Sequence, residues 1–214
     1  MRLTVLAVAA LTLAPAAGEA QPREPISRVD VAATVGSFNR QHENLSQDDD
    51  WTHSFFRGVS VGYYWTDHTK TELEVAWGGT DELYRSVPLD LPDAPPWARV
   101  FSEHAFDETV GSLSQTYQFG RNAMFHPFLA VGVDVVREEE TVDRPAQYVS
   151  IATGRSIFVP AAETSHTSVF ARPFFAAGFK AYVSERGFFR TDLKFGLHDE
   201  VEQVVWKIGM GFDF

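Results

Sequence analysis

The sequence contains no cysteine among its 214 residues. This absence excludes a disulfide framework, a thiolate metal site, a catalytic thiol and lipid attachment through cysteine. The chain also lacks an excess of basic residues, because 18 Lys and Arg stand against 29 Asp and Glu, for a net charge of -11. A nucleic-acid-binding protein normally needs a basic face, so we expect no nucleic-acid partner.

Long apolar runs are scarce, and the only extended one lies at the N-terminus. Arg2 precedes an apolar stretch over residues 3–13, Pro15 follows it, and small residues lead to Ala20. The stretch is about 11 residues long, well short of the roughly 20 that a membrane-spanning helix needs. The pattern predicts a signal peptide over residues 1–20, cleaved near Ala20, and a mature exported domain over residues 21–214.

Motifs for common catalytic chemistry are also missing. There is no phosphate-binding loop, no dinucleotide fingerprint and no Gly-x-Ser-x-Gly motif. The seven histidines are scattered without a metal-ligand spacing. We therefore expect no cofactor, no metal site and no catalytic residue.

What the mature chain does contain is alternation of period two, which is typical of β-strands. In each alternating segment one row is apolar, and the other row consists largely of Gly, Ala, Ser and charged residues, as where Leu129, Val131 and Val133 alternate with Ala130, Gly132 and Asp134. Eight such segments can be recognised, over residues 28–35, 58–65, 72–77, 106–119, 129–135, 175–180, 189–197 and 203–214.

The composition of the two rows predicts which way each faces. Small residues suit the crowded interior of a narrow closed barrel, which leaves the apolar row for lipid. Short connections alternate with long ones, and the long loops are expected near residues 40–54, 80–105 and 137–166. The sequence therefore predicts an all-β fold, an eight-stranded antiparallel up-and-down transmembrane β-barrel.

A soluble lipocalin-like barrel is the alternative fold. Such a barrel would bury its apolar rows and expose its polar rows, the reverse of a membrane barrel. The direction of Val131, Leu193 and Trp206 decides between the two.

The last strand carries a family resemblance. Apolar residues occupy alternate positions up to a terminal aromatic, at Trp206, Ile208, Met210, Phe212 and Phe214. This ending resembles the C-terminal signature of bacterial outer-membrane proteins, and residues 190–195 look like the penultimate strand of small barrels of the OmpA, OmpX and opacity-protein type. The resemblance implies a Gram-negative outer-membrane location, contact with outer-membrane lipid and recognition of the last strand by the barrel-assembly machinery.

Ten charged residues fall on or beside the rows expected to face the lumen, five acidic and five basic. Buried charges must be paired, so we expect a balanced network that plugs the lumen, with a gated ion path through it as the alternative. The expected network consists of Arg28, Asp30, Glu72, Glu74, Asp134, Lys180, Arg190, Asp192, Lys194 and Lys207.

The loops on the expected outer side are acidic, with 17 acidic and 6 basic residues over 40–54, 80–105, 137–166 and 198–202. Residues 48–50 and 138–140 are acidic triplets that could attract a divalent cation or a basic surface ligand. Four prolines predict that 80–105 is a stiff, irregular loop. Residues 148–151 and 157–159 are expected to form an extra hairpin about Gly154.

These observations favour a non-enzymatic outer-membrane barrel with a structural or surface-recognition role. A lipid-modifying enzyme is one alternative, because His166, Thr167 and Ser168 have the His-x-Ser spacing of outer-membrane lipid A deacylases, although the expected acid is not evident. A narrow pore or a carrier for small molecules is the other alternative.

Overall fold

The computed structural model describes residues 28–41, 51–79, 81–89, 95–119, 124–152, 154–197 and 201–214. The predicted signal peptide, residues 1–20, lies outside the described residues. No helix in the described part of the chain is long and apolar enough to cross a membrane. Eleven strands account for nearly all of the described residues.

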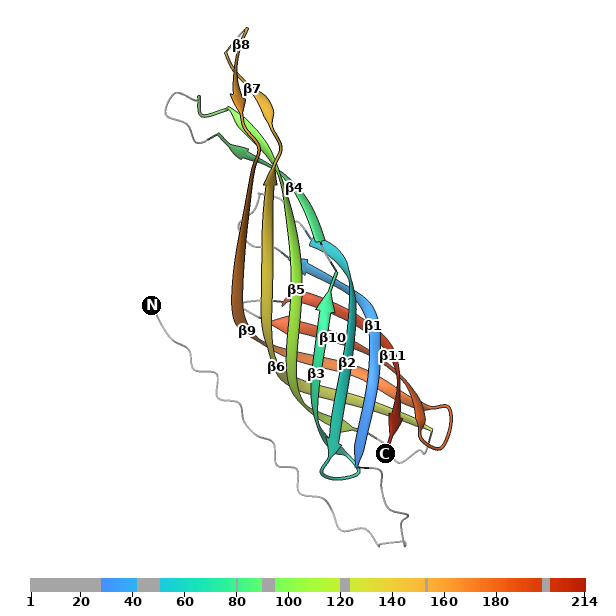
Figure 1. Ribbon diagram of the computed structural model, residues 1–214. Helices are drawn as coiled ribbons and strands as arrows, with labels where there is room; N and C mark the ends of the chain where they lie inside the picture. The colour runs from blue at the N-terminus through green and yellow to red at the C-terminus, as the bar shows by residue number, and fades with distance from the viewer. Residues whose placement is uncertain are drawn as a thin grey trace, which may run out of the picture.

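Eight strands form a closed antiparallel barrel, seen in Figure 1 as a tall tilted cylinder. The order around the wall is β3-β2-β1-β11-β10-β9-β6-β5, and the pairing of β3 with β5 closes it. These strands are β1 (Val29–Gln41), β2 (Trp51–Tyr64), β3 (Thr69–Gly78), β5 (Arg99–Gln118), β6 (Phe125–Arg144), β9 (Ala162–Tyr182), β10 (Gly187–Leu197) and β11 (Val201–Asp213). The predicted eight-stranded barrel is confirmed.

The direction of the side chains excludes the lipocalin-like alternative. Val131, Leu193 and Trp206 are 59%, 41% and 49% exposed, so the apolar rows face away from the barrel. The alternate positions, such as Ala130 and Asp134, are buried. Gln115, which interrupts the apolar row of β5, accepts a hydrogen bond from Thr71 Oγ1 on the neighbouring strand at 2.8 Å.

Three barrel strands continue well past the apolar rows and form a tall extension, at the top of Figure 1. β5, β6 and β9 remain paired there, from Glu103 with Asp143 to Arg144 with Ala162. β3 pairs with the lower part of β5, and β4 (Asp81–Pro88) pairs with its upper part. The extension comprises residues 81–89, 95–107, 137–152 and 154–168.

The extension corrects the prediction of long loops over 80–105 and 137–166. Residues 81–88 and 99–106 pair as a hairpin, and Pro88 lies on β4, an edge strand, where a missing N–H is tolerated. Similarly, strand pairing extends to Arg144 and resumes at Ala162, so residues 145–161 lie between paired strands. Beyond the bilayer neither face of a strand needs an apolar row, so the alternation fades while the backbone pairing continues.

A second hairpin stands at the tip of the extension and confirms the hairpin predicted there. β7 (Gln147–Ala152) pairs with β8 (Arg155–Val159) across a turn where Gly154 has φ 75°. Its inner face packs on the β4–β5 hairpin, so that the tip is a small two-layer sandwich, which we call the tip sandwich. The shared core consists of Leu89, Ala98, Val100, Val149 and Val159, with Val87 and Ile151 against it.

The outward rows make a specific prediction about stability. Val131 lies in the middle of the outward row of β6, so Val131→Arg places a charge in hydrocarbon and should lower the free energy of unfolding by about 2–4 kcal/mol. Urea unfolding of the protein in lipid vesicles measures this. Thr141→Arg, further along the same row and above its apolar part, is the control and should change stability by less than about 0.5 kcal/mol. Equal effects of the two substitutions would contradict the placement of the bilayer.

Candidate functional site

The barrel lumen holds the densest cluster of charged side chains in the described residues. Period-two alternation places every second residue of each strand inside, and many of those positions carry Lys, Arg, Asp or Glu. The buried charged residues of the barrel strands are Asp30, Arg40, Lys70, Glu72, Glu74, Glu108, Asp134, Arg172, Lys180, Arg190, Asp192, Lys194, Lys207 and Asp213. Seven are acidic and seven basic, so charge is balanced inside.

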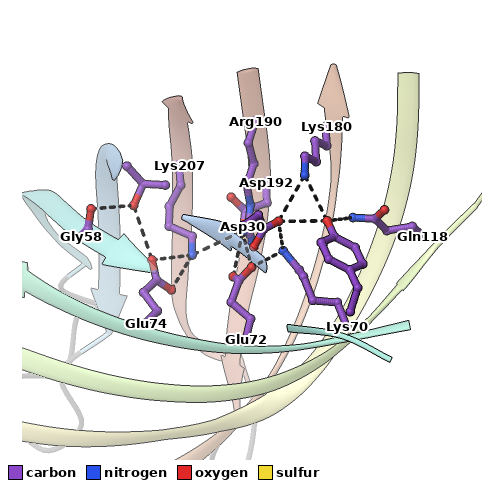
Figure 2. Close-up of polar contacts among 12 residues, drawn as sticks. Asp30, Gly58, Lys70, Glu72, Glu74, Gln118, Lys180, Arg190, Asp192 and Lys207 are labelled. Carbon is purple, nitrogen blue, oxygen red and sulfur yellow. Dashed lines mark hydrogen bonds and ion pairs between the residues drawn. The ribbon is translucent and has the colours of Figure 1, made fainter. Parts of the chain in front are cut away.

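Asp30 on β1 is the centre of one cluster of charges (Figure 2). This cluster is near the end of the barrel where β1 begins and β11 ends. Its Oδ2 lies 2.9 Å from Lys70 Nζ and 3.2 Å from Lys180 Nζ. The Tyr64 hydroxyl also donates a hydrogen bond to this oxygen at 2.9 Å. Gly62, the register partner of Asp30, leaves the space that this pairing needs, because a Cβ there would lie 2.2 Å from Asp30 Oδ1.

Further along the lumen, two carboxylates of β3 each hold a basic side chain from the far wall. Arg190 Nη1 donates to both carboxylate oxygens of Glu72 at 2.7 Å. Lys207 Nζ donates to both oxygens of Glu74, at 3.1 and 2.8 Å. Asp192 lies 3.3 Å from Arg190 and 3.4 Å from Lys207, and so links the two pairs into one network.

Asp134 is the centre of a third group, and its side chain is fully buried. Its Oδ1 accepts hydrogen bonds at 2.7 Å from both Lys194 Nζ and Ser112 Oγ. Arg172 Nη2 lies 3.7 Å from Asp134 Oδ2 and 3.3 Å from Glu108 Oε1. The ion pairs therefore form three neighbouring groups along the lumen.

The outer half of the lumen also contains an apolar cluster. It consists of Phe38, Phe56, Ala76, Val110, Val136 and Val205 from six strands, with Phe170 packed against it. The guanidinium groups of Arg40 and Arg172 both lie over the Phe170 ring, at 5.6 and 6.0 Å from its centroid. Arg40 in turn forms an ion pair with Glu138.

The structure places nine of the ten predicted lumen charges inside the barrel. The exception is Arg28, which is exposed and precedes the first residue of β1, so its assignment to the network is corrected. Its backbone oxygen accepts a hydrogen bond from the Tyr64 amide. The row of β1 begins to face the lumen only at Asp30.

Sequence reasoning missed several members of the network. Lys70, Glu108, Arg172 and Asp213 are buried and paired. Arg172 lies in phase with Lys180 on β9, but Pro173 and the absence of a clear apolar row before Phe175 concealed the strand. Continuing the period-two alternation of each strand beyond its apolar part would have assigned these residues to the row that faces the lumen.

Each glutamate of the 138–140 triplet has its own partner. Glu138 pairs with Arg40, Glu139 with Arg137 at 3.1 Å, and Glu140 with His104 at 2.8 Å. In the part of the chain that the structure describes, no group of three or more acidic or histidine side chains is arranged to hold a metal ion. Residues 48–50 lie outside the described residues.

A Ser-His-acid hydrogen-bond chain occurs, but not at His166 and Ser168, the residues with the His-x-Ser spacing. His166 is exposed on the extension, and no hydrogen bond between its side chain and Ser168 is found among the described residues. Instead, Ser102 Oγ lies 3.1 Å from His104 Nε2, and His104 Nδ1 lies 2.8 Å from Glu140 Oε1. Ser102 is only 3% exposed, and the amide next to it, of Phe101, is held by the Gln147 side chain, so this site lacks an open nucleophile and a free adjacent amide.

The predicted assembly signal lies on the outer wall. Trp206, Met210, Phe212 and Phe214 are exposed, with Ile208 partly exposed in the same row. β11 pairs with β1 and β10 along its length, so this row lies on the wall where the first and last strands meet.

Comparison with known proteins agrees with this geometry. The N-terminal barrel of OprF from Pseudomonas aeruginosa matches with a TM-score of 0.51 and 15% identity, covering 89% of this chain and 100% of that one. Neisserial surface protein A matches at 0.53 and 16%, covering 89% and 100%. OprG from Pseudomonas aeruginosa matches at 0.53 and 14%, covering 88% and 97%.

At these identities the solved structures establish the fold alone. A search of curated proteins finds no match. A family model described as an outer membrane protein beta-barrel domain matches residues 3–214, almost the whole sequence. With its closed eight-stranded wall and outward apolar rows, the chain belongs to the outer-membrane β-barrel protein family.

Proposed function

We propose that the protein is a sealed, non-enzymatic outer-membrane barrel that carries an acidic recognition surface on its extension. The observation that supports the proposal is that ion pairs and aromatic side chains from different strands meet inside the barrel, where a pore would need open space. Eight strands leave a bore that side chains can fill. The barrel then serves as an anchor, and the extension is the part available to a partner.

The contents of the lumen support a seal in three ways. The ion pairs tie opposite walls together, as Lys207 does with Glu74, which is 133 residues away in the sequence. The cavity lined by Lys70, Thr116, Gln118, Phe128, Lys180, Phe188 and Arg190 measures about 10 Å³, which is about the space that one water molecule needs. The outer apolar cluster adds a constriction that water and ions enter unfavourably.

The position of the extension supports the recognition role. Outer-membrane barrels have short turns toward the periplasm and long connections outside, and the extension lies opposite the end where β1 begins and β11 ends (Figure 1). Within the described residues of the extension, nine acidic side chains stand against five basic ones. The balanced lumen therefore leaves the net negative charge of the chain on its outside.

The proposal includes the events that bring the chain to the membrane. The signal peptide is removed near Ala20, the barrel-assembly machinery recognises the terminal strand through Trp206 to Phe214, and outer-membrane lipid covers the apolar rows. The buried position of Ser102 supports the absence of catalysis.

The energetics of the lumen give a testable prediction. Removing one member of a buried ion pair leaves the other charge unpaired, which costs about 3–5 kcal/mol. Asp134→Ala should therefore lower the free energy of unfolding by about that amount, because it leaves Lys194 without its carboxylate. Urea unfolding in lipid vesicles measures the change.

The matched control removes both charges. Asp134→Leu with Lys194→Met replaces the pair by apolar side chains and should recover most of the lost stability. A single variant that costs less than about 1 kcal/mol would show that the lumen is hydrated enough to solvate Lys194, and the seal would then be wrong.

Conductance in planar lipid bilayers tests the seal itself. The natural protein should show no discrete conductance steps. Phe38→Ala with Phe56→Ala shortens two side chains of the outer apolar cluster, which are each 4% exposed, and should produce open events. Phe55→Ala is the control, because Phe55 is 59% exposed on the outer wall. Steady conductance of the natural protein would contradict the proposal and favour a pore.

A further inference from the structure

The outer face of the β4–β5 hairpin, in the extension, carries aromatic side chains far from the bilayer. Tyr84 and Phe101 are 58% and 48% exposed, and their rings lie nearly parallel, at 20°, with centroids 6.0 Å apart. Thr109 on β5 pairs with Trp77, the last member of the apolar row of β3. Phe101 is eight residues beyond Thr109, about 26 Å along the strand at roughly 3.3 Å per residue. These rings therefore do not belong to the aromatic belt at the membrane surface.

Between the bilayer and these rings the same outward row is polar. Asp107 is exposed and Glu103 is partly exposed, and both lie on β5 between Phe101 and the membrane-facing part of the strand. The strand therefore leaves the apolar environment and then presents aromatic surface again. Exposed aromatic surface away from lipid is typical of a site of interaction with a partner.

Carboxylates flank the aromatic pair. Tyr84 is the register partner of Glu103, and its hydroxyl lies 3.5 Å from Glu82 Oε2. Glu103 and Glu82 together raise the pKa of the Tyr84 phenol above its ordinary value, so both negative charges act at this ring. The site thus combines two exposed rings with two acidic groups in one place.

This combination selects a particular kind of side chain. A guanidinium group is planar, stacks on aromatic faces and can donate two hydrogen bonds to one carboxylate, whereas an ammonium group is a compact, strongly hydrated charge. The acidic surplus of the extension attracts basic partners over longer distances. An arginine side chain matches the rings and the carboxylates at the same time.

We propose that the face formed by Glu82, Tyr84, Phe101 and Glu103 is a docking site for an arginine-bearing segment of a partner protein. This deepens the recognition role proposed above and rests on it. Arg99, on the same face, already donates a hydrogen bond to the Ser86 backbone oxygen at 3.3 Å and borders the site at its upper end.

The tip sandwich offers an internal control. Tyr148 and Phe158, on β7 and β8, form a second exposed pair, 75% and 53% exposed with ring centroids 5.1 Å apart. The same face of that hairpin continues with Ser150 and Ser156 in place of acids. The two pairs therefore differ in the carboxylates beside them and in the angle between their rings, which is 20° for Tyr84 with Phe101 and 53° for Tyr148 with Phe158.

The experiment measures binding of fluorescently labelled peptides to the full-length protein in lipid nanodiscs. The probes are a (Gly-Arg)₄ peptide and a (Gly-Lys)₄ peptide of equal charge, followed by fluorescence anisotropy at low and high salt. We expect the arginine peptide to bind more tightly. Tyr84→Ala with Phe101→Ala should weaken its binding by about fivefold to tenfold and remove the preference for arginine.

Two further variants make the result specific. Glu103→Gln should weaken binding of both peptides and reduce the dependence on salt, because it removes a charge and keeps the shape. Tyr148→Ala with Phe158→Ala should leave binding of the arginine peptide within twofold of the natural protein. Heat-modifiable mobility on gels confirms that each variant remains a folded barrel.

Several results would overturn the inference: no binding by the natural protein, equal binding of the two peptides, or equal losses from the two aromatic double variants. None of these results depends on conductance. A barrel that does not conduct in planar bilayers and shows no preference for the arginine peptide would support the sealed anchor and exclude this docking site. A barrel that conducts and binds the arginine peptide would exclude the seal and support the docking site.

Discussion

The constraint on which the rest of the structure depends is that no backbone amide or carbonyl can face hydrocarbon without a hydrogen-bond partner. The pairing of β3 with β5 meets this constraint, because it turns an open sheet into a closed wall. Closure fixes the two environments of every strand. One row of each strand meets lipid and the other is confined to a narrow lumen, which explains why apolar side chains alternate with small or charged ones.

A narrow lumen imposes a second requirement, that its charges be paired. The side chains that meet there come from strands distant in sequence, and each group joins acids and bases across the barrel, as Lys180 of β9 does with Asp30 of β1. Glycine contributes to this arrangement at the positions where the pairs need room: a Cβ at Gly196 would lie 2.8 Å from Arg172 Nε. The ion pairs and the apolar cluster together make the interior a packed core, although much of that core is ionic.

The extension follows from the same pairing rules in a different solvent. Water satisfies backbone groups and tolerates polar side chains on both faces, so β5, β6 and β9 continue as strands without apolar rows. Only at the tip does an apolar interior return, where Val100 and Val149 pack between two hairpins. This small core holds the β4–β5 hairpin in place, and its outer face presents Tyr84 and Phe101 beside carboxylates.

The sequence by itself determined the fold class, the number of barrel strands, the outward direction of Val131, Leu193 and Trp206, and nine of the lumen charges. These features follow from alternation, because the period of a strand is local and the bilayer makes one row apolar. Only the tertiary structure decided which charges pair, that Arg28 lies outside the lumen, and that the expected loops are paired strands. Pairing depends on register between distant segments. Where water replaces lipid, the apolar rows that mark a strand in the sequence fade, and only the short hairpin about Gly154 was predicted there.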